Sequence, residues 1–384
     1  MAQRILLVFL IDALGHRLVR ETGAFSFLQG AEAPVASVCG YSSACIPSLL
    51  TGRRPREHGH WAMYLCDSER SVFRPYRGLI RVLASWLGRH FLTRRLLTRL
   101  LRRRIRGYFS LYEIPSDLLT RLDLCEKADI FAPGAFPGIE TPFDAAQRLG
   151  VPYRAWHWNT GEEERRRRFE EALREGRERM LFFYSPLLDA VMHAEGTRGE
   201  GARRCLAQIE AWIASMLALA RARGLEARLL VCGDHGMADV TGTHEILPEL
   251  EALPLRAPED FLYFVDSTMV RVWYRRPGAR EMVEALLRAK PFGRLIDGEE
   301  RRRLGIDFPD GRYGETIFLM NAGEILAPSF MGRTAPQAMH GYHPEDPDSD
   351  TVVLTSFDRP PIGSIRDIGP LLVREIEALA GEGR

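Results

Sequence analysis

Three continuous apolar runs constrain the fold of this chain more than any other feature. They read ILLVFLI, MLFFYS and ARLLVCG, at residues 5–11, 180–185 and 227–233. A strand that is covered on both faces needs apolar residues at successive positions, as in parallel sheets between helices. The stretches at 162–178 and 201–224 carry apolar residues at spacings of three and four, which is typical of amphipathic helices. This alternation predicts an α/β fold with a mostly parallel central sheet flanked by helices.

Two regions interrupt the alternation. The first, at 61–125, has no acidic residue from Ser71 to Tyr112. Its predicted helix sets one apolar stripe among arginines, formed by Leu92, Leu96, Leu97, Leu100, Leu101 and Ile105. The second, at 255–325, reads as a strand pair in FLYFVDSTMVRVWYRR, then a helix, then an extended segment near ETIFLM. We therefore expect a metal-binding catalytic α/β core (1–60, 126–254 and 326–384), a basic helical cap insertion (61–125) and a small α+β insertion (255–325).

Composition excludes several classes of protein. The net charge of +1 predicts no general attraction to nucleic acids or membranes. The six cysteines are scattered without a CxxC pair, which favours reduced thiols in the cytoplasm over disulfides or a cysteine zinc cluster. The first apolar run is short and ends at Asp12 with no small-residue cleavage site, so it predicts a buried strand and not a signal peptide. No continuous apolar stretch reaches the ~18 residues of a membrane span.

Ionisable side chains follow each apolar run. Asp12 follows the first, Asp189 and His193 follow the second, and Asp234 and His235 follow the third. In open α/β sheets, binding and catalysis gather at this carboxyl edge. Asp189 and His193 are four residues apart, which places both on one face of a helix.

Late in the chain, APQAMHGYHPED adds His340 to these residues. Taken singly, each has a common structural explanation, because a strand-end Asp is often a helix cap and a DxxxH spacing often arises by chance. Taken together, the carboxylates and imidazoles form a mixed ligand set that suits Zn²⁺ or Mn²⁺.

A candidate nucleophile lies in GYSSACIPSLLTGRRPREHGH, at residues 40–60. Its hydroxyl groups stand at the start of a predicted helix, where the helix N-terminus favours negative charge. A serine at this place, beside two divalent cations, could ionise and attack phosphorus.

The order of these motifs resembles the alkaline phosphatase superfamily, and within it the type I phosphodiesterase/nucleotide pyrophosphatase branch. The resemblance extends from residue 12 to residue 342, over most of the chain. Its landmarks are Asp12, Ser42, Thr51-Gly52, Pro55, His58-Gly59, Asp189, His193, Asp234-His235-Gly236-Met237 and His340-Gly341-Tyr342.

The resemblance implies an alkaline phosphatase-like fold and two divalent metal ions, zinc or manganese. One ion would be held by Asp189, His193 and His340, and the other by Asp12, Asp234, His235 and the nucleophile oxygen of Ser42. In the family that this sequence resembles, the nucleophile lies nine residues before the Thr of the TG pair, which implies Ser42 here, and a slip of one residue would give Ser43.

The expected activity is that of a two-metal phosphodiesterase or nucleotide pyrophosphatase with a phospho-serine intermediate. Alternatives are a phosphomonoesterase, a phosphoryl or phosphoethanolamine-type transferase on a lipid-linked substrate, and a degenerate binding protein on the same fold. Diesterases of this kind often place an amide on a phosphoryl oxygen and monoesterases an arginine, and that residue would lie in 61–150. The stretch CIPS resembles the sulfatase motif, but Leu49 replaces the expected Arg, so Cys45 is expected to be a buried apolar residue.

The basic stretch at 79–106 has two interpretations. It is either a helical cap with a solvated arginine face, or a surface helix that rests on anionic lipid at the inner membrane surface. Partners expected from the sequence are a small-molecule or lipid-linked phosphodiester or pyrophosphate. No nucleic-acid polymer is expected, because aromatic residues are not interleaved with the arginines.

Overall fold

The computed structural model describes residues 3–67, 69–81, 91–156 and 160–382. Its five-stranded central sheet has the order β15-β6-β1-β5-β4. Four strands run parallel and only β15 is antiparallel to its neighbour β6. The strands are β1 (Arg4–Ile11), β4 (Tyr153–Ala155), β5 (Met180–Ser185), β6 (Glu226–Cys232) and β15 (Val353–Thr355). The predicted α/β fold with a mostly parallel sheet is confirmed.

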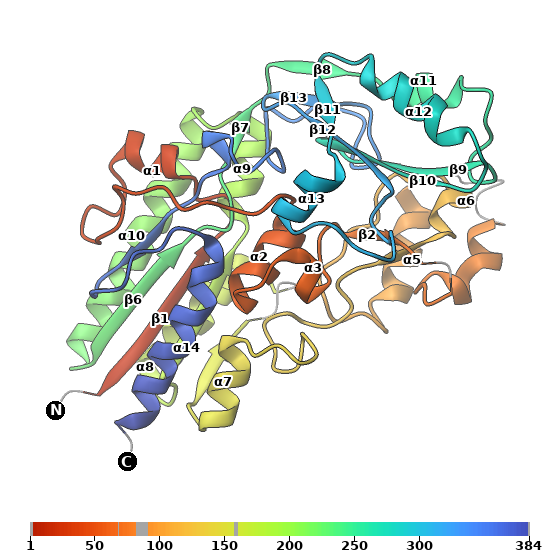
Figure 1. The fold of residues 1–384 in the computed structure, drawn as a ribbon. Coiled ribbons are helices and arrows are strands. Elements are labelled where there is room, and N and C mark those ends of the chain that lie inside the picture. The colour runs from red at the N-terminus through yellow and green to blue at the C-terminus, as the bar shows by residue number, and fades with distance from the viewer. Residues whose placement is uncertain (1–2, 68, 82–90, 157–159, 383–384) are drawn as a thin grey trace.

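Helices cover both faces of this sheet (Figure 1). One face packs on α8 (Glu162–Glu175), α9 (Leu187–Glu195) and α10 (Glu200–Ala222), and the other on α2 (Ser42–Thr51), α7 (Pro142–Leu149) and α14 (Ile368–Gly381). Successive side chains of β1 alternate between the two resulting cores, Leu7 and Phe9 on one side and Leu6 and Val8 on the other. This alternation explains why the run had to be apolar throughout.

A second sheet, entirely antiparallel, has the order β11-β12-β10-β9. It lies beside the central sheet in Figure 1. Its elements are β9 (Phe261–Val265), β10 (Met269–Tyr274), α12 (Ala279–Arg288), β11 (Gly293–Leu295), α13 (Gly298–Leu304) and β12 (Thr316–Met320), preceded by α11 (Leu247–Glu251). The strand pair, helix and extended segment predicted for this region are all present.

The segment between α3 (Pro55–His58) and α7 is only partly helical. It contains η1 (Arg74–Tyr76), α5 (Phe91–Leu101) and α6 (Ser116–Leu119), and also the antiparallel pair β2 (Tyr64–Cys66) and β3 (Leu122–Leu124). The β2–β3 pair, which the helical prediction missed, joins the two ends of this excursion. The division of the chain into core, cap and insertion stays a prediction.

The predicted leucine stripe is only partly correct. Leu97, Leu101 and Ile105 are buried in the core of the second sheet, whereas Leu96 is 46% exposed. Neighbouring positions on a helix point about 100° apart, so the rows of side chains that contain Leu96 and Leu97 cannot both face the core. The side chain of Leu92, and residues 82–90 of the stretch 79–106, lie outside the described residues.

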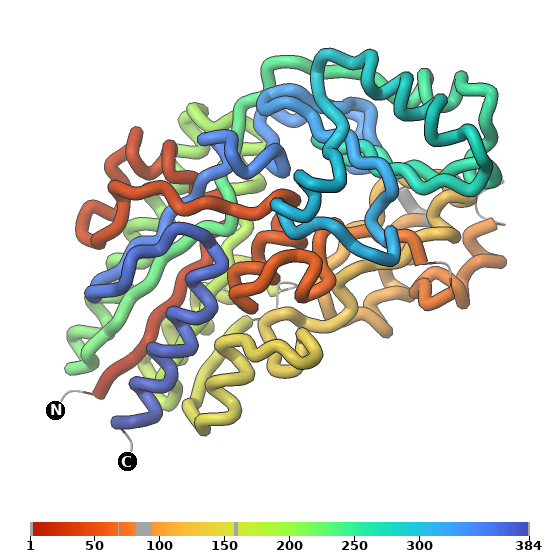
Figure 2. The backbone as a smooth tube through the Cα atoms, viewed as in Figure 1, coloured from red at the N-terminus to blue at the C-terminus, as the bar shows by residue number. Residues whose placement is uncertain are grey.

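Short pairings bring distant loops together at the carboxyl edge of the central sheet. β7 (Ala238–Asp239) pairs with β14 (Ala338–Met339), and β8 (Gly242–His244) pairs with β13 (Glu324–Leu326). Two short turns, η2 (Pro347–Ser349) and η3 (Ile365–Asp367), flank β15, and α1 (His16–Thr22) follows β1. The chain trace shows the first strand and the last helix side by side (Figure 2).

Among the described residues, one helix, α10, is long and apolar enough to cross a membrane by length and composition alone. The sequence did not indicate this, because polar residues interrupt its apolar ones. Its inner face, including Leu206, Ile209 and Ile213, packs in the core against the central sheet. We therefore interpret α10 as a core helix.

Candidate active site

Ser42 is the first residue of α2, at the carboxyl edge of the central sheet. The preceding Tyr41 is extended, and its hydroxyl is 2.6 Å from Oγ1 of Thr268, in the turn between β9 and β10. Gly40 makes the turn into the helix with a φ of 133°, and a Cβ there would lie 2.8 Å from the Cβ of Ala44. The turn into α2 therefore needs glycine.

The two candidate nucleophiles point in different directions. Oγ of Ser42 is 3.0 Å from Nε2 of His235 and 3.4 Å from Oδ1 of Asp12. Oγ of Ser43 instead donates a hydrogen bond to the carbonyl of Trp61 at 3.2 Å. These contacts favour Ser42 over Ser43.

Asp12, Asp234 and His235 form one cluster around Ser42. Nε2 of His235 lies 3.3 Å from Oδ1 of Asp12 and 3.3 Å from Oδ2 of Asp234. The other oxygen of Asp234 accepts from the backbone N–H groups of Ala13 and His235. All three side chains are buried, with at most 3% of each residue exposed.

Asp189, His193 and His340 form a second cluster. Oδ1 of Asp189 is 3.3 Å from Nε2 of His193 and 3.5 Å from Nε2 of His340. Asp189 and His193 lie a turn apart on α9, as their spacing predicts. The β7–β14 pair brings His340 beside them, directly after β14.

The residues present fit divalent metal ions. The potential ligand atoms of Asp189, His193 and His340 all lie within 4.8 Å of one another, and so do those of Asp12, Asp189 and His235. Asp189 therefore stands between the two clusters. Oδ1 of Asp189 and Oδ2 of Asp234 are buried without a hydrogen-bond partner in the described chain, as expected of ligand atoms.

Two of the imidazoles are oriented by a hydrogen bond to the backbone. Nδ1 of His193 donates to the carbonyl of Ala338 at 2.8 Å, and Nδ1 of His235 donates to the carbonyl of Gly236 at 2.9 Å. Each ring therefore turns Nε2 toward its cluster. A backbone carbonyl on the outer nitrogen is the usual arrangement around a metal-ligating histidine.

The electrostatics of the site also call for cations. Burial, together with the negative charge of Asp12, raises the pKa of Asp234 to about 8. Burial and the same charge raise the pKa of Asp189. Burial would lower the pKa of His235, but the charges of Asp234 and Asp12 outweigh it and raise the pKa to about 10. Carboxylates packed this closely need positive charge between them.

Several motif residues have structural roles. Nε2 of His58 lies 2.9 Å from Oγ of Ser48, and burial lowers the pKa of His58 to about 3. Cys45 is fully buried and burial raises its pKa well above the usual value, which agrees with its expected apolar role. His343 pairs with Glu300 of α13 at 3.1 Å. Gly236 is required by space, because a Cβ there would lie 2.1 Å from the carbonyl of Asp348.

Sequence reasoning missed Tyr184, whose hydroxyl donates to Oδ2 of Asp12 at 2.5 Å. A possible signal was its position, because it is a polar aromatic next to the end of an otherwise apolar strand. The phosphate-contacting residue in 61–150 was left open between an amide and an arginine, and the one carboxamide in that range, Gln147, is exposed on α7, which packs against α14. A carboxamide side chain from this range therefore does not contact the phosphoryl oxygen of a substrate.

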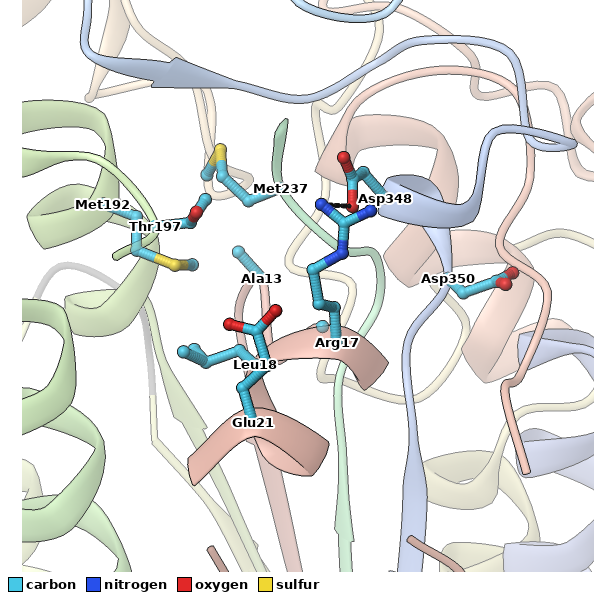
Figure 3. A pocket seen from close by; sticks show the side chains of 10 residues that line it. Ala13, Arg17, Leu18, Glu21, Met192, Thr197, Met237, Asp348 and Asp350 are labelled. Carbon is cyan, nitrogen blue, oxygen red and sulfur yellow. Dashed lines mark ion pairs between the residues drawn. The ribbon is translucent and has the colours of Figure 1, made fainter. Parts of the chain in front are cut away.

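A small cavity lies on the α1 side of the site (Figure 3). Its volume of about 20 Å³ suffices for a water molecule and not for a substrate. Arg17 and Asp348 form an ion pair of 2.6 Å beside it. Ala13 and Met237, which follow candidate ligands in the sequence, line it, but none of the candidate ligands does.

Comparison with known proteins identifies a family and a shared fold for this chain. A family model described as type I phosphodiesterase / nucleotide pyrophosphatase matches residues 6–301. No curated protein matches the chain.

Among solved structures, murine ectonucleotide pyrophosphatase / phosphodiesterase 5 matches with a TM-score of 0.68 and 15% sequence identity, over 98% of this chain and 95% of that chain. The human protein of the same name matches with a TM-score of 0.67, 15% identity and the same coverage of both chains. An inactive variant of the murine protein, in complex with AMP, matches with a TM-score of 0.66, again at 15% identity and over 98% and 95% of the two chains. At this identity, the structures show a shared fold.

Proposed function

The chain belongs to the type I phosphodiesterase/nucleotide pyrophosphatase family, and we propose that Ser42 attacks the phosphorus of a small phosphodiester or pyrophosphate in this enzyme. The family is one of phosphodiesterases and nucleotide pyrophosphatases, so the chain is an enzyme of the hydrolase type. The observation that carries the proposal is the position of Ser42, with its Oγ 3.0 Å from His235 and 3.4 Å from Asp12.

The candidate ligands would hold two divalent ions, which we propose to be zinc, with manganese as the alternative. Asp189, His193 and His340 would bind one, and Asp12, Asp234, His235 and Oγ of Ser42 the other. When bound, such ions supply Lewis-acid charge that lowers the pKa of a hydroxyl group and stabilises charge on phosphoryl oxygens.

The chain's own residues orient the reaction. Ser42 stands at the N-terminus of α2, where the helix dipole favours the negative charge of a phosphoryl group. The backbone N–H groups of Ser42 and Ser43 donate to no other described residue, which leaves them available to phosphoryl oxygens. Nδ1 of His235 donates to the carbonyl of Gly236, so Nε2 is the ring nitrogen that faces Ser42.

The proposed reaction has two steps. In the first, Oγ of Ser42 gives up its proton to solvent and forms a bond to phosphorus while the bond from phosphorus to the leaving oxygen breaks, which gives a phospho-serine and frees the leaving group. In the second, the oxygen of a water molecule bonds to phosphorus and releases a proton, the bond from phosphorus to Oγ breaks, and Oγ takes up a proton. In a transferase, an acceptor alcohol would take the place of water in the second step.

We propose a nucleotide-like diester or pyrophosphate as the substrate. A relative of the same fold is described as bound to AMP, which supports a ligand that combines a phosphate with a larger group. A lipid-linked pyrophosphate is the alternative substrate, which would present the same phosphoryl chemistry on a different substituent.

The test compares hydrolysis of bis-p-nitrophenyl phosphate and p-nitrophenyl phosphate by chelated protein, with Zn²⁺ or Mn²⁺ added back. A metal-dependent preference for the diester is the expected result. A preference for the monoester would reassign the enzyme as a phosphatase. Phosphoryl transfer to an added alcohol in excess of hydrolysis would identify a transferase.

We propose further that the enzyme is cytoplasmic and that the stretch 79–106 contacts the anionic inner membrane surface. The support is the set of arginines along α5, including Arg94, Arg95 and Arg99, together with the exposed Leu96. Sedimentation with vesicles that contain anionic lipid, at low salt, tests this contact. Equal sedimentation with neutral and anionic vesicles, or none with either, would contradict it.

A further inference from the structure

The carboxylate of Asp12 is held by its two oxygens in different ways. Oδ1 faces the site, 3.4 Å from Oγ of Ser42 and 3.3 Å from Nε2 of His235. Oδ2 accepts the hydrogen bond from the hydroxyl of Tyr184 at 2.5 Å. A carboxylate with one oxygen engaged outside the site offers a single, directed oxygen to a ligand.

Tyr184 is itself fixed by the strand that carries it. β5 pairs in parallel with β1, with Tyr184 opposite Leu10 and Ser185 opposite Ile11. The carbonyl of Ser185 accepts from the backbone N–H of Asp12 at 2.9 Å. The end of β5 therefore holds Asp12 twice, through the backbone and through the phenol.

Two charged residues from α8 anchor this end of β5. Nη1 of Arg165 donates to the carbonyl of Tyr184 at 2.8 Å, and the hydroxyl of Ser185 donates to Glu162 at 2.7 Å. Arg165 is only 3% exposed and its guanidinium lies over the ring of Phe183. Because the guanidinium is charged, its hydrogen bond to the carbonyl is stronger than one between neutral groups and holds the strand end in place.

We infer that Tyr184 is a positioning residue, which turns Asp12 so that Oδ1 alone faces the space shared with His235 and Ser42. The inference rests on the proposed function, because that space is where the ion held by Asp12 would bind. Hydrogen bonds of this kind to metal ligands typically contribute about 10–100-fold in metal affinity or activity.

The test is a metal titration of chelated Tyr184→Phe, followed calorimetrically without substrate. The variant removes only the hydroxyl and keeps the ring that packs 5.6 Å from Phe131. We expect the affinity for the ion held by Asp12 to fall about 10–100-fold, while the affinity for the ion held by the other cluster stays at the wild-type value. With bis-p-nitrophenyl phosphate, kcat at limiting metal should fall and KM should change little.

Tyr153→Phe is the matched control. Tyr153 lies on β4, the neighbour of β5, and packs on Phe143 with ring centroids 5.7 Å apart. Within the described chain, its hydroxyl makes no hydrogen bond to a candidate ligand. Both metal affinities should remain unchanged in this variant.

Three outcomes would overturn the inference. If Tyr184→Phe binds each of the two ions as tightly as the wild type does, the proposed function stands and the positioning role is lost. If KM rises while both affinities hold, Tyr184 contacts substrate instead. If the wild-type chain binds no ion, the proposed function itself fails. If Tyr184→Phe does not fold, Glu162→Gln can be measured in its place. It weakens the hydrogen bond from Ser185 at the same strand end and should lower the affinity for the same ion.

Discussion

The imidazole of His340 stacks on that of His235, with ring centroids 3.8 Å apart and the planes 11° from parallel. Each ring belongs to a different candidate metal cluster, so the two clusters are in direct contact through these rings. Burial lowers the pKa of His340 well below its usual value, and the positive charges of His235 and His193 lower it further. His340 is therefore a neutral ring, which is the form that ligates a metal.

This relationship predicts how metal binding responds to loss of His340. His340→Ala should weaken one of two ions, the one shared with Asp189 and His193, because it removes a ligand from that cluster alone. Metal content after dialysis, measured by mass spectrometry, should fall from two ions to about one per chain. His343→Ala is the control, since His343 belongs to the same loop but pairs with Glu300. Equal loss of both ions would show that the clusters are not separable.

Ser42→Ala should abolish turnover and leave the protein able to bind metal. Loss of a nucleophile typically costs several orders of magnitude in kcat, here at least about 10³-fold. Ser43→Ala should retain most of the activity, because the Ser43 hydroxyl bonds to the carbonyl of Trp61. Steady-state hydrolysis of the preferred ester measures both variants. Full activity of Ser42→Ala would refute the proposed mechanism.

A buried ion pair makes the attachment of the second sheet to β2 sensitive to mutation. Arg271 is fully buried, bonds to Asp266 at 3.1 Å and donates to the carbonyl of Tyr64 at 2.7 Å. Arg271→Met should lower the free energy of unfolding by about 3–5 kcal/mol, because it leaves the buried Asp266 unpaired. Chemical denaturation measures the change.

Two further variants test this explanation. Adding Asp266→Asn to Arg271→Met should recover much of the stability, since the unpaired charge is removed. Arg276→Met breaks an exposed pair with Asp260 and should cost less than about 1 kcal/mol. If the double variant is no more stable than Arg271→Met, lost packing and not the charge explains the effect.

Glu126 predicts a pH dependence of stability. Burial raises the pKa of its carboxyl from 4.5 to about 8, against the hydrogen bond from the N–H of Tyr108. The folded chain therefore retains this proton more strongly than the unfolded chain. The stability that the proton contributes is complete below pH 4.5 and is lost as pH rises through about 8, at about 1.4 kcal/mol per unit of pKa shift.

Glu126→Gln should remove this dependence. Relative to wild type, the variant should gain stability between pH 5 and pH 9, measured by denaturant unfolding at several pH values. Glu377→Gln, at a half-exposed side chain of α14, is the control and should follow wild type at every pH. A constant difference between Glu126→Gln and wild type across this range would contradict the raised pKa.

The central sheet and most of the candidate ligands could be predicted because they depend on local patterns. The apolar run before Asp12 predicts a buried strand, and the four-residue spacing of Asp189 and His193 predicts that both lie on one face of a helix. Tyr184 could not be found in this way, because its role depends on which strand lies beside β1. Nor could the pattern decide that Leu97 is buried and Leu96 exposed, since that depends on what the helix packs against.

The place of His340 in its cluster depends on the pairing of β7 with β14. His340 directly follows β14, so it stands beside Asp189 and His193 only where β14 is paired with β7. A chain emerging from the ribosome thus presents Asp12 and Ser42 long before their last partner is made. Contacts between residues this distant in sequence raise the contact order of a fold and slow its folding. Under the proposed ligand assignment, a nascent chain has no complete centre until synthesis has passed residue 340.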